Sequence, residues 1–410
     1  MKILIVHNFY QRRGGEDSVM ESERSLLLSA GHEVIEYFRH NDEIRTYSLP
    51  QKMRLAAGTI WASDGYRKLR HILRAERPDI AHFYNTFPLI SPAAFHACLD
   101  EGVPVVQAVQ NYRLFCPEGN FFRNGRVCEE CVETSLFRGV WHGCYHHSRL
   151  QTAVVAGMLA VHRGMNTWME RANAFIVCTQ FAREKFLSQG FPAGKVFVKP
   201  NFVFADPGPR SVPGEAPLIV GRLSPEKGVR IAPSAWAHLA NGVPLRVVGD
   251  GPLRAELESE FARSKRHKVV FEGWLPREKS IEAIKAANFL VFPSLCYEAF
   301  PVAIAEAYAC GVAVIASRLG SMAEIVQDGV TGLHFEPGDA ADLARKVEWA
   351  WNHPEETARM GRAARAEYEA KYTPEVNYKL LMDIYSRAIA VHGQRNPGKT
   401  TAAELSGRPS

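Results

Sequence analysis

Residues 289–308 read FLVFPSLCYEAFPVAIAEAY, and this stretch decides the predicted fold. It opens with an apolar run, Phe289–Ser294, of the kind found in strands that are buried on both faces of a parallel sheet. A loop with Glu298 follows, and an apolar helical pattern then begins near Phe300 and includes Glu306. The first amides of such a helix form a site for an anion. A strand that leads through a loop into a helix is the repeating unit of an α/β domain, whose ligands lie beyond the carboxyl ends of the strands.

Similar apolar runs alternate with helical patterns along the whole chain. Each half has six of them, which predicts an α/β fold with two doubly wound, Rossmann-like parallel-sheet domains that face one another across a cleft. The runs of the first half are Lys2–His7, Glu33–Phe38, Ile80–Tyr84, Val105–Val109, Phe175–Thr179 and Val196–Lys199. Those of the second half are Leu218–Leu223, Leu245–Asp250, Val269–Trp274, Phe289–Ser294, Ala313–Ser317 and Gly332–Glu336.

A segment rich in Pro and Gly, residues 205–217, has no apolar period and is predicted to be a linker. It separates an N-terminal domain of residues 1–204 from a C-terminal domain of residues 218–375. Residues 376–392 are predicted to form a helix that packs back on the N-terminal domain, and the polar residues 393–410 a disordered tail. The tail matches G-x-x-x-x-G-K-[ST] at residues 393–400, but no strand precedes the match, so an ATP site is not predicted there.

The composition is that of a globular protein. The chain has 410 residues, 46% of them hydrophobic, and a net charge of +5. Its N-terminus is typical of a strand rather than of a signal peptide, and the longest apolar stretch, residues 153–161, is too short to span a membrane. These features favour a cytoplasmic location.

Basic and apolar side chains alternate between residues 51 and 78. The cations are Lys52, Arg54, Arg67, Lys68, Arg70, Arg74 and Arg77, and they are interleaved with Trp61, Tyr66, Leu69, Ile72 and Leu73. A basic amphipathic helix with aromatic anchors suits the anionic inner face of the plasma membrane, and a solvated helix face is the alternative. Nucleic acid is not a predicted partner, because no recognition motif accompanies the charge.

Two further loops follow predicted strands and suit phosphate groups. In the segment Gly221–Gly228, Arg222 offers a forked cation and Lys227 a point charge, which together suit a diphosphate. Gly14 and Gly15 follow the first strand and allow a phosphate or a sugar to approach the backbone closely.

This combination of motifs resembles glycosyltransferase family 4, whose members have the GT-B architecture, over residues 1–390. The family's E-x7-E signature matches Glu298 and Glu306, its Arg/Lys diphosphate pair matches Arg222 and Lys227, and its N-terminal glycine loop matches Gly14 and Gly15. The loop Gly249–Pro252 and the segment Lys199–Phe202 also have counterparts in the family. The resemblance implies a donor site formed by Gly14, Gly15, Arg222, Lys227, Gly249, Glu298, Phe300, Pro301 and Glu306.

The chemistry implied by the resemblance is retaining, metal-independent transfer of a sugar from a UDP- or GDP-sugar. Glu298 would meet hydroxyls of the transferred sugar, and Glu306 the hydroxyls of the ribose. Arg222, Lys227 and helix dipoles would stabilise the leaving diphosphate in place of a divalent ion. The sequence agrees in one respect, since it lacks the Asp-x-Asp motif that holds the metal in the other major glycosyltransferase architecture.

The acceptor is expected to enter through the N-terminal domain, near residues 82–90 and 110–145, and a lipid-linked oligosaccharide of surface polysaccharide biosynthesis is the first expectation. A soluble small-molecule acceptor is the alternative. A degenerate transferase that only binds a glycan or a nucleotide, and a GT-B nucleotide-sugar epimerase, are rival functions.

Gln110 departs from the family pattern. Many members carry a histidine in the catalytic cleft after the fourth strand, where this chain has Gln110 in the sequence VQNYR. Glutamine binds a sugar hydroxyl but cannot shuttle a proton, so catalysis would depend on the departing phosphate. His7 and His82 also end strands and are alternative candidates.

The eight cysteines divide into two groups. Cys98, Cys178, Cys296 and Cys310 lie in apolar segments and are interpreted as buried side chains of a reducing compartment. The second group, Cys116, Cys128, Cys131 and Cys144, contains a C-x2-C knuckle and has the composition of a structural zinc site. Free thiols or a disulfide are the alternatives, and His142, His146 and His147 compete as ligands.

Overall fold

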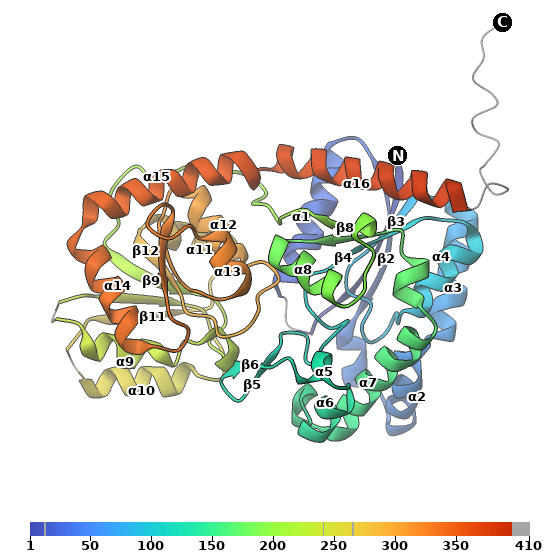
Figure 1. Ribbon diagram of the computed structural model, residues 1–410, viewed down its shortest axis with the longest axis horizontal. Helices are drawn as coiled ribbons and strands as arrows, with labels where there is room; N and C mark the ends of the chain where they lie inside the picture. Colours follow the sequence, from blue (N-terminus) through green and yellow to red (C-terminus); the bar gives the residue numbers. More distant parts are fainter. Residues whose placement is uncertain (12–13, 241, 265, 396–410) are drawn as a thin grey trace, which may run out of the picture.

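The computed structural model describes residues 1–11, 14–240, 242–264 and 266–395. They form two α/β lobes that lie side by side and are bridged along one edge by the last two helices (Figure 1). Each lobe contains a six-stranded parallel sheet, so the predicted fold class is confirmed.

The N-terminal sheet has the strand order β2-β1-β3-β4-β7-β8. Its strands are β1 (Lys2–Phe9), β2 (Glu33–His40), β3 (Ile80–Phe83), β4 (Val105–Ala108), β7 (Ala174–Val177) and β8 (Val196–Val198). Side chains of β1 alternate between two cores, because successive residues of a strand point to opposite faces. Leu4 and Val6 enter one apolar cluster, and Ile3 and Ile5 enter the other.

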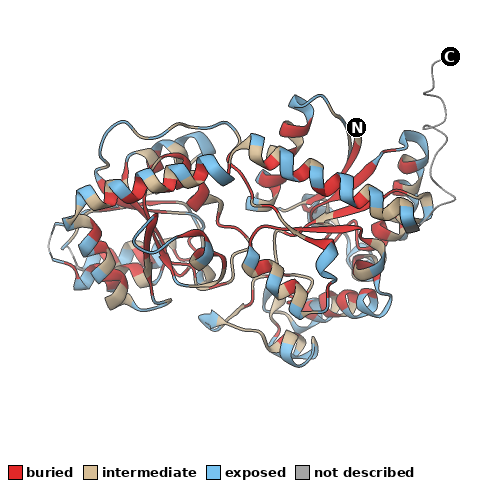
Figure 2. Ribbon diagram, turned by 45° about the horizontal axis from the view of Figure 1, so that its top comes forward, coloured by how far each residue is buried: buried red, intermediate tan, exposed pale blue. Residues whose placement is uncertain are grey.

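The C-terminal sheet has the order β11-β10-β9-β12-β13-β14. Its strands are β9 (Ala216–Val220), β10 (Leu245–Val248), β11 (Val269–Gly273), β12 (Ala287–Phe292), β13 (Val314–Ser317) and β14 (Gly332–Phe335). All twelve strands of the two sheets coincide with predicted apolar runs, because a strand covered on both faces is apolar throughout. Figure 2 shows the resulting pattern, with buried strands inside and helices exposed on their outer sides.

Helices of different lengths surround the two sheets. In the N-terminal half they are α1 (Gly15–Ser29), α2 (Leu49–Ile60), α3 (Ser63–Glu76), α4 (Ala93–Glu101), α5 (Glu130–Glu133), α6 (Phe137–His142), α7 (Arg149–Gly164) and α8 (Gln180–Ser188). In the C-terminal half they are α9 (Ile231–His238), α10 (Arg254–Ser264), α11 (Arg277–Lys285), α12 (Val302–Ala309), α13 (Gly320–Ile325), α14 (Ala340–Asn352), α15 (Pro354–Lys371) and α16 (Pro374–Arg395). Short helical turns are η1 (Asn41–Thr46), η2 (Tyr145–His147), η3 (Thr167–Arg171), η4 (Ala193–Lys195) and η5 (Pro225–Lys227).

Helix α16 returns to the N-terminal lobe. Its residues Leu381, Ile384 and Tyr385 join the apolar cluster that contains Ile3 and Ile5 of β1. The last residues of the predicted tail, 396–410, lie outside the described residues, and so does most of the match at 393–400.

The basic segment differs from the prediction of one amphipathic helix. It forms two helices, α2 and α3, with Trp61 at the break between them. Leu69 and Leu73 of α3 are buried in the N-terminal core, while Arg70 and Arg74 pair with Glu101 of α4. The expected anchors therefore face the protein, because α4 supplies both an apolar neighbour and a carboxylate for this helix. Among the described residues, no helix is long and apolar enough to cross a membrane.

Candidate active site between the lobes

Lys227 and Glu298 meet where two neighbouring strands of the C-terminal sheet end. Strand β12 pairs with β9, so the loops that follow them share one edge of the sheet. The Nζ of Lys227 lies 2.7 Å from Oε1 of Glu298, which also accepts a 2.7 Å hydrogen bond from the hydroxyl of Ser294. Burial alone lowers the pKa of Lys227, but the Glu298 carboxylate outweighs it and the net pKa is raised. Lys227 is therefore a permanent cation at the strand ends.

Two glycines allow the loops to pack this closely. A Cβ on Gly228 would lie 1.9 Å from the carbonyl oxygen of Pro293, and one on Gly249 would lie 1.8 Å from that of Gly221. Gly228 and Gly249 also have positive φ angles, of 67° and 138°. The predicted site residue Gly249 thus has a clear packing role between the loops after β9 and β10.

Three further predicted site residues, Phe300, Pro301 and Glu306, lie at the start of helix α12 or within it. Pro301 is its N-cap, and Phe300 lies directly before it, buried against Tyr372 at 5.7 Å between ring centroids. The first backbone amides of α12 have no acceptor within the helix, and Glu298 lies three residues before Pro301 in the chain.

Glu306 of α12 has a partner that the sequence did not reveal. Its Oε1 lies 3.2 Å from Nε of Arg277, at the start of α11, and Arg277 also donates to the carbonyl of Phe204 in the connection between the lobes. Burial raises the pKa of Glu306, and the ion pair with Arg277 opposes that effect. Arg277 thus adds a cation beside the expected ribose carboxylate.

Arg222 is exposed and faces the opposite lobe. It lies within electrostatic range of Glu118, a half-buried carboxylate of the N-terminal lobe. Burial raises the pKa of Glu118 to about 7, although the nearby Arg113 and Arg222 lower it. Among the described residues, Oε2 of Glu118 has no hydrogen-bond partner. Glu118 was not among the predicted site residues, although it lies within the segment 110–145 where the acceptor was expected to enter.

The lobes are joined next to Glu298 by Tyr297. The Tyr297 hydroxyl donates a 2.9 Å hydrogen bond to Glu129 of the N-terminal lobe, and its ring packs on Phe181 at 4.7 Å. Nearby, the carboxylate of Glu324 on α13 accepts the backbone amides of Gln180 and Phe181 at the start of α8, at 2.8 and 2.7 Å. The loop with Glu298 is therefore held against the N-terminal lobe.

Gln110 lines a small open pocket in the N-terminal lobe, together with Glu16, Asn111 and Arg113. Its side-chain amide exchanges two hydrogen bonds with that of Asn201, at 3.0 and 2.8 Å. Asn201, at the end of the N-terminal domain, therefore fixes the orientation of the Gln110 side-chain amide. Its assignment as a catalytic residue stays a prediction.

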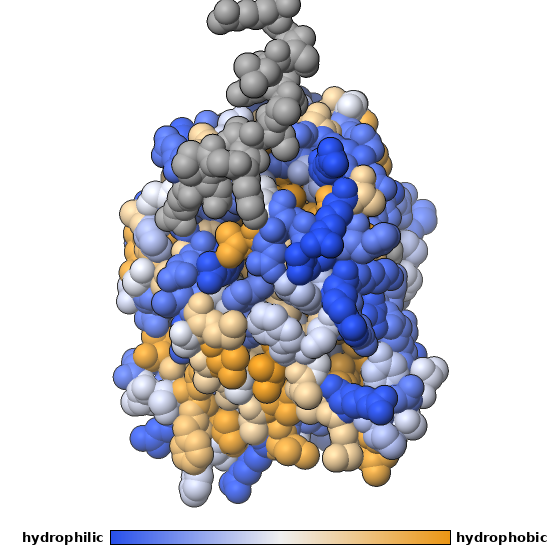
Figure 3. All heavy atoms as spheres, turned by 90° about the vertical axis from the view of Figure 1, so that its right-hand side faces the viewer, coloured by the Kyte–Doolittle hydropathy of each residue, from blue (hydrophilic) through white to orange (hydrophobic). Residues whose placement is uncertain are grey.

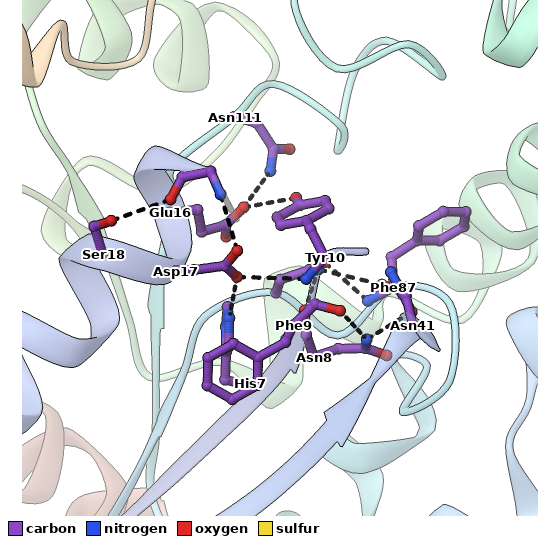
Figure 4. A network of polar contacts seen from close by, with 12 residues as sticks. His7, Asn8, Phe9, Tyr10, Glu16, Asp17, Ser18, Asn41, Phe87 and Asn111 are labelled. Atoms are coloured by element: carbon purple, nitrogen blue, oxygen red, sulfur yellow. Dashed lines mark hydrogen bonds and ion pairs between the residues drawn. The ribbon is translucent and has the colours of Figure 1, made fainter. Parts of the chain in front are cut away.

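A buried polar network surrounds the first turn of α1, beside this pocket (Figure 4). Oε2 of Glu16 accepts hydrogen bonds from the hydroxyl of Tyr10 at 2.7 Å and from the amide of Asn111 at 3.1 Å. Burial raises the pKa of Glu16, and the attraction of His7 opposes that effect. Sequence reasoning missed Glu16, although its position directly after Gly15 was a usable signal.

The glycine loop itself is open. Within the described part of the chain, no atom lies within 4 Å of a Cβ built on Gly14 or Gly15, and Gly14 has an extended backbone with φ of −121°. Neither backbone strain nor internal packing therefore accounts for Gly14. Its amide donates to Asp17 at 3.0 Å, and Asp17 in turn contacts His7 at 2.8 Å.

Both strand-end histidines have structural partners. His7 is fully buried against Asp17, and His82 is fully buried against the hydroxyl of Tyr385 at 2.7 Å. Burial lowers the pKa of His82 to about 4, so its ring is neutral at physiological pH. Among the described residues, Nδ1 of His7 and Nε2 of His82 have no hydrogen-bond partner, so a role of either side chain in the reaction stays a prediction.

The second cysteine group lies in the segment between β4 and α7. Sequence reasoning missed a short hairpin in this segment, β5 (Phe122–Arg123) and β6 (Arg126–Val127). All eight cysteines are free thiols. Among the described residues, no three Cys, His, Asp or Glu side chains are already arranged as ligands of one metal ion.

Both lobes match known families. Residues 214–367 match the family described as "Glycosyl transferases group 1", and residues 26–201 match the "Glycosyl transferase 4-like domain". The chain is 31% identical to glycogen synthase of Mycobacterium tuberculosis over 393 residues, which is 91% of this chain and 90% of that protein. It is 32% identical to D-rhamnosyltransferase WbpZ of Pseudomonas aeruginosa over 158 residues, 38% of this chain and 41% of that protein, so this second match spans less than half of the relative.

Solved structures have the same fold. Sucrose-phosphate synthase of Thermosynechococcus elongatus superposes with a TM-score of 0.68 at 18% identity, covering 95% of this chain and 99% of that one. HepE of Anabaena, solved in complex with UDP, gives 0.65 at 18% identity, covering 94% and 100%. Two matching domains, a relative matched along nearly its full length and a common architecture lead to one conclusion. The chain is a glycosyltransferase that belongs to family 4 and has the GT-B fold.

Proposed function

We propose that the protein is a retaining, metal-independent glycosyltransferase that moves a sugar from a nucleotide diphosphate donor to a lipid-linked oligosaccharide in surface polysaccharide biosynthesis. The observation that carries the donor part is the Lys227–Glu298 pair at the ends of β9 and β12, with a distance of 2.7 Å. It brings a cation for a diphosphate and a carboxylate for a sugar together at the edge of the sheet where α/β domains bind ligands.

The leaving group is a diphosphate whose negative charge grows as the glycosidic bond breaks. Lys227 has three N–H donors, so it can contact Glu298 and a phosphate oxygen at the same time. Arg222 is exposed beside it and adds a forked donor, and the first amides of α12 add a helix terminus. Lys227 is held by Glu298 before the reaction, so it can stabilise the departing charge with little reorganisation.

The remaining donor contacts follow from α12. Glu306 is anchored by Arg277 and has spare oxygen lone pairs for ribose hydroxyls. Glu298 keeps its second carboxylate oxygen for hydroxyls of the transferred sugar. The structure of HepE with UDP supports a uridine or related nucleotide for this architecture, and a UDP- or GDP-sugar is the proposed donor.

The acceptor would bind in the N-terminal pocket beside the glycine loop. Glu16, Asn111 and Arg113 line this pocket and offer hydrogen-bond partners for sugar hydroxyls. Gly14 and Gly15 leave space through which an acceptor could approach the backbone. Because Gln110 cannot take a proton, the departing phosphate is the proposed base.

An exposed apolar face supports an acceptor at a membrane. It is formed by helices α2, α6 and α7, which pack on one another, and the orange area in the lower half of Figure 3 lies on this side of the molecule. Its exposed side chains are Leu49, Met53, Phe137, Trp141, Leu150, Val161 and Met165. Exposed cations among them are Lys52, Arg54, Arg138 and Arg149. Apolar and cationic side chains on one face suit an anionic lipid surface.

A donor and acceptor screen tests the proposal. The full chain is incubated with UDP-, GDP- and ADP-sugars, with EDTA and either a polyprenyl diphosphate-linked glycan in vesicles or soluble sugars, and release of nucleoside diphosphate is measured. We expect release with one UDP- or GDP-sugar, stimulation by the lipid-linked acceptor, and an α-configured product. Stimulation by soluble sugars alone would favour a small-molecule acceptor. Nucleotide binding without turnover by the wild type would favour a degenerate transferase, and isomerisation of the donor an epimerase.

A further inference from the structure

Four cysteines between β4 and α7 take no part in the proposed transfer. Cys116 follows a tight turn, with its amide bonded to the carbonyl of Tyr112 at 2.9 Å. Cys128 follows the β5–β6 hairpin, Cys131 lies in α5, and Cys144 follows α6. The chain thus places the cysteines on four different structural elements of one small segment.

These elements bring the four thiols together. The Cys131 thiol lies within electrostatic range of the thiols of Cys116, Cys128 and Cys144, and the Cys144 thiol within range of Cys116 and Cys128. The packing around them is tight. A Cβ on Gly139 would lie 3.2 Å from Sγ of Cys131 and 3.1 Å from the ring of Pro117, which follows Cys116.

Backbone amides surround two of the sulfur atoms. The amides of Glu118, Gly119 and Phe121 lie near the Cys116 sulfur, and the amide of Gly139 lies near the Cys131 sulfur. Amide donors of this kind orient metal-bound ligands and offset the charge of a thiolate.

Two cations lie beside the cluster. The Arg123 guanidinium hydrogen-bonds to Cys128, and Arg163 lies within electrostatic range of Cys131. The Glu118 carboxylate lies near Cys144 and, unlike the two arginines, disfavours a negative charge on the thiol. Four thiolates around a divalent ion carry two net negative charges; Arg123 is also ion-paired with Glu130, so Arg163 is the cation that complements them.

Two of the three histidines that could compete as ligands are engaged elsewhere. His142 contacts Glu130 at 2.9 Å, while His146 contacts Gln151 at 3.1 Å and stacks on Tyr145 at 4.1 Å. The four thiols are therefore the better ligand set.

We propose that Cys116, Cys128, Cys131 and Cys144 bind one structural zinc ion, which fixes the position of Glu129 at the junction of the lobes. Four S–H bonds break, four protons go to solvent, and four Zn–S bonds form, with no change of oxidation state. Because the side chains are not already arranged as ligands, the sulfur atoms must turn toward a common point.

Glu129 connects this site to the reaction centre. It stands in the Cys128–Cys131 knuckle, and its carboxylate accepts hydrogen bonds from Lys185 at 2.7 Å and from Tyr297 at 2.9 Å. Tyr297 directly precedes Glu298 in the chain. A zinc-bound knuckle holds Glu129 rigidly, and Glu129 in turn holds the loop of the C-terminal lobe.

Metal analysis of the full chain tests the zinc site, and it does not depend on the proposed donor or acceptor. Protein purified from zinc-supplemented cells is expected to contain about one zinc ion per chain, as a four-thiolate site does. A mercurial thiol reagent should release the zinc to a colorimetric chelator. Cys131→Ser should lose it, whereas Cys98→Ser, which changes a buried cysteine of α4, should keep it. A reduced wild type that binds no zinc when Zn²⁺ is added, or that forms two disulfides instead, overturns the proposal even if Cys131→Ser does not fold.

A second measurement tests the connection to the lobe junction. Tyr297→Phe leaves the thiols intact but removes the hydrogen bond to Glu129, so it should keep zinc while local opening rises about tenfold or more in hydrogen exchange near residues 129–131. Zinc-stripped wild type should show the same rise. If Tyr297→Phe raises exchange and zinc removal does not, zinc has no role at the junction. If Tyr297→Phe changes nothing, the Glu129 contact does not hold the lobes.

Discussion

Replacing Lys227 with methionine removes the cation assigned to the diphosphate while keeping a side chain of similar length. In the structure its Nζ lies 2.7 Å from Glu298, and the two side chains are 31% and 12% exposed. An exposed ion pair contributes about 0.2–1 kcal/mol, whereas breaking a fully buried one costs about 3–5 kcal/mol. The pair is intermediate, and Ser294 still donates to Glu298 after the change. We therefore expect a loss of about 1–2 kcal/mol in the free energy of unfolding.

The effect on catalysis should be larger than the effect on stability. Removing one fixed donor from a developing negative charge costs about 2.7–4 kcal/mol, which lowers kcat by about 10²–10³. Donor turnover by Lys227→Met is compared with its urea unfolding curve, and Lys279→Met serves as the matched control. Lys279 pairs with Glu282 on the surface, with both side chains more than 60% exposed, so its loss should change neither quantity. A kcat for Lys227→Met within about threefold of the wild type would refute the role of this cation.

Three further predictions concern packing, pH and the membrane face. Gly249→Ala, at a φ of 138°, should lower the free energy of urea unfolding by more than about 1 kcal/mol, while Gly14→Ala should leave it within about 0.5 kcal/mol but reduce turnover. Buried His82 has a pKa of about 4 against 6.5 when unfolded, so the stability it contributes is complete above pH 6.5 and is lost as the pH falls toward 4. Urea unfolding across this range should show a loss of up to about 3 kcal/mol that His82→Phe lacks, and an equal slope in both proteins would contradict it. Leu150→Glu should weaken sedimentation of the protein with anionic vesicles, whereas Val212→Glu, a change at an exposed residue in the connection between the lobes, should not. Equal vesicle binding by both variants would refute a membrane-binding role of the exposed apolar face.

The strands were predictable because their burial on both faces makes them continuously apolar, a property that local sequence records. The positions of Lys227 and Glu298 at the strand ends were also predictable, because their motifs directly follow two such strands. Arg277 was missed because its contact with Glu306 spans 29 residues and depends on how α11 packs beside α12. The pairing of Gln110 with Asn201, 91 residues away, has no local signal either.

For the basic segment, the sequence pattern predicted an exposed amphipathic helix, but the apolar side of α3 is covered. Its spacing is amphipathic, but spacing does not say what covers the apolar side. Here α4 covers it, and Glu101 neutralises two of its arginines. The exposed apolar side chains lie on α2, which is the first part of this segment, and on α6 and α7, and these three helices are brought together only by folding.

Calorimetric titration with UDP and with GDP tests the central claim most directly, because the donor is assigned to the C-terminal lobe. One of the two nucleotides should bind to the wild type and to Gln110→Ala with similar affinity. Binding to Lys227→Met should weaken by about tenfold or more, as expected for the loss of a charged hydrogen bond to phosphate. Equal affinity of Lys227→Met and wild type, or loss of binding in Gln110→Ala alone, would contradict the account.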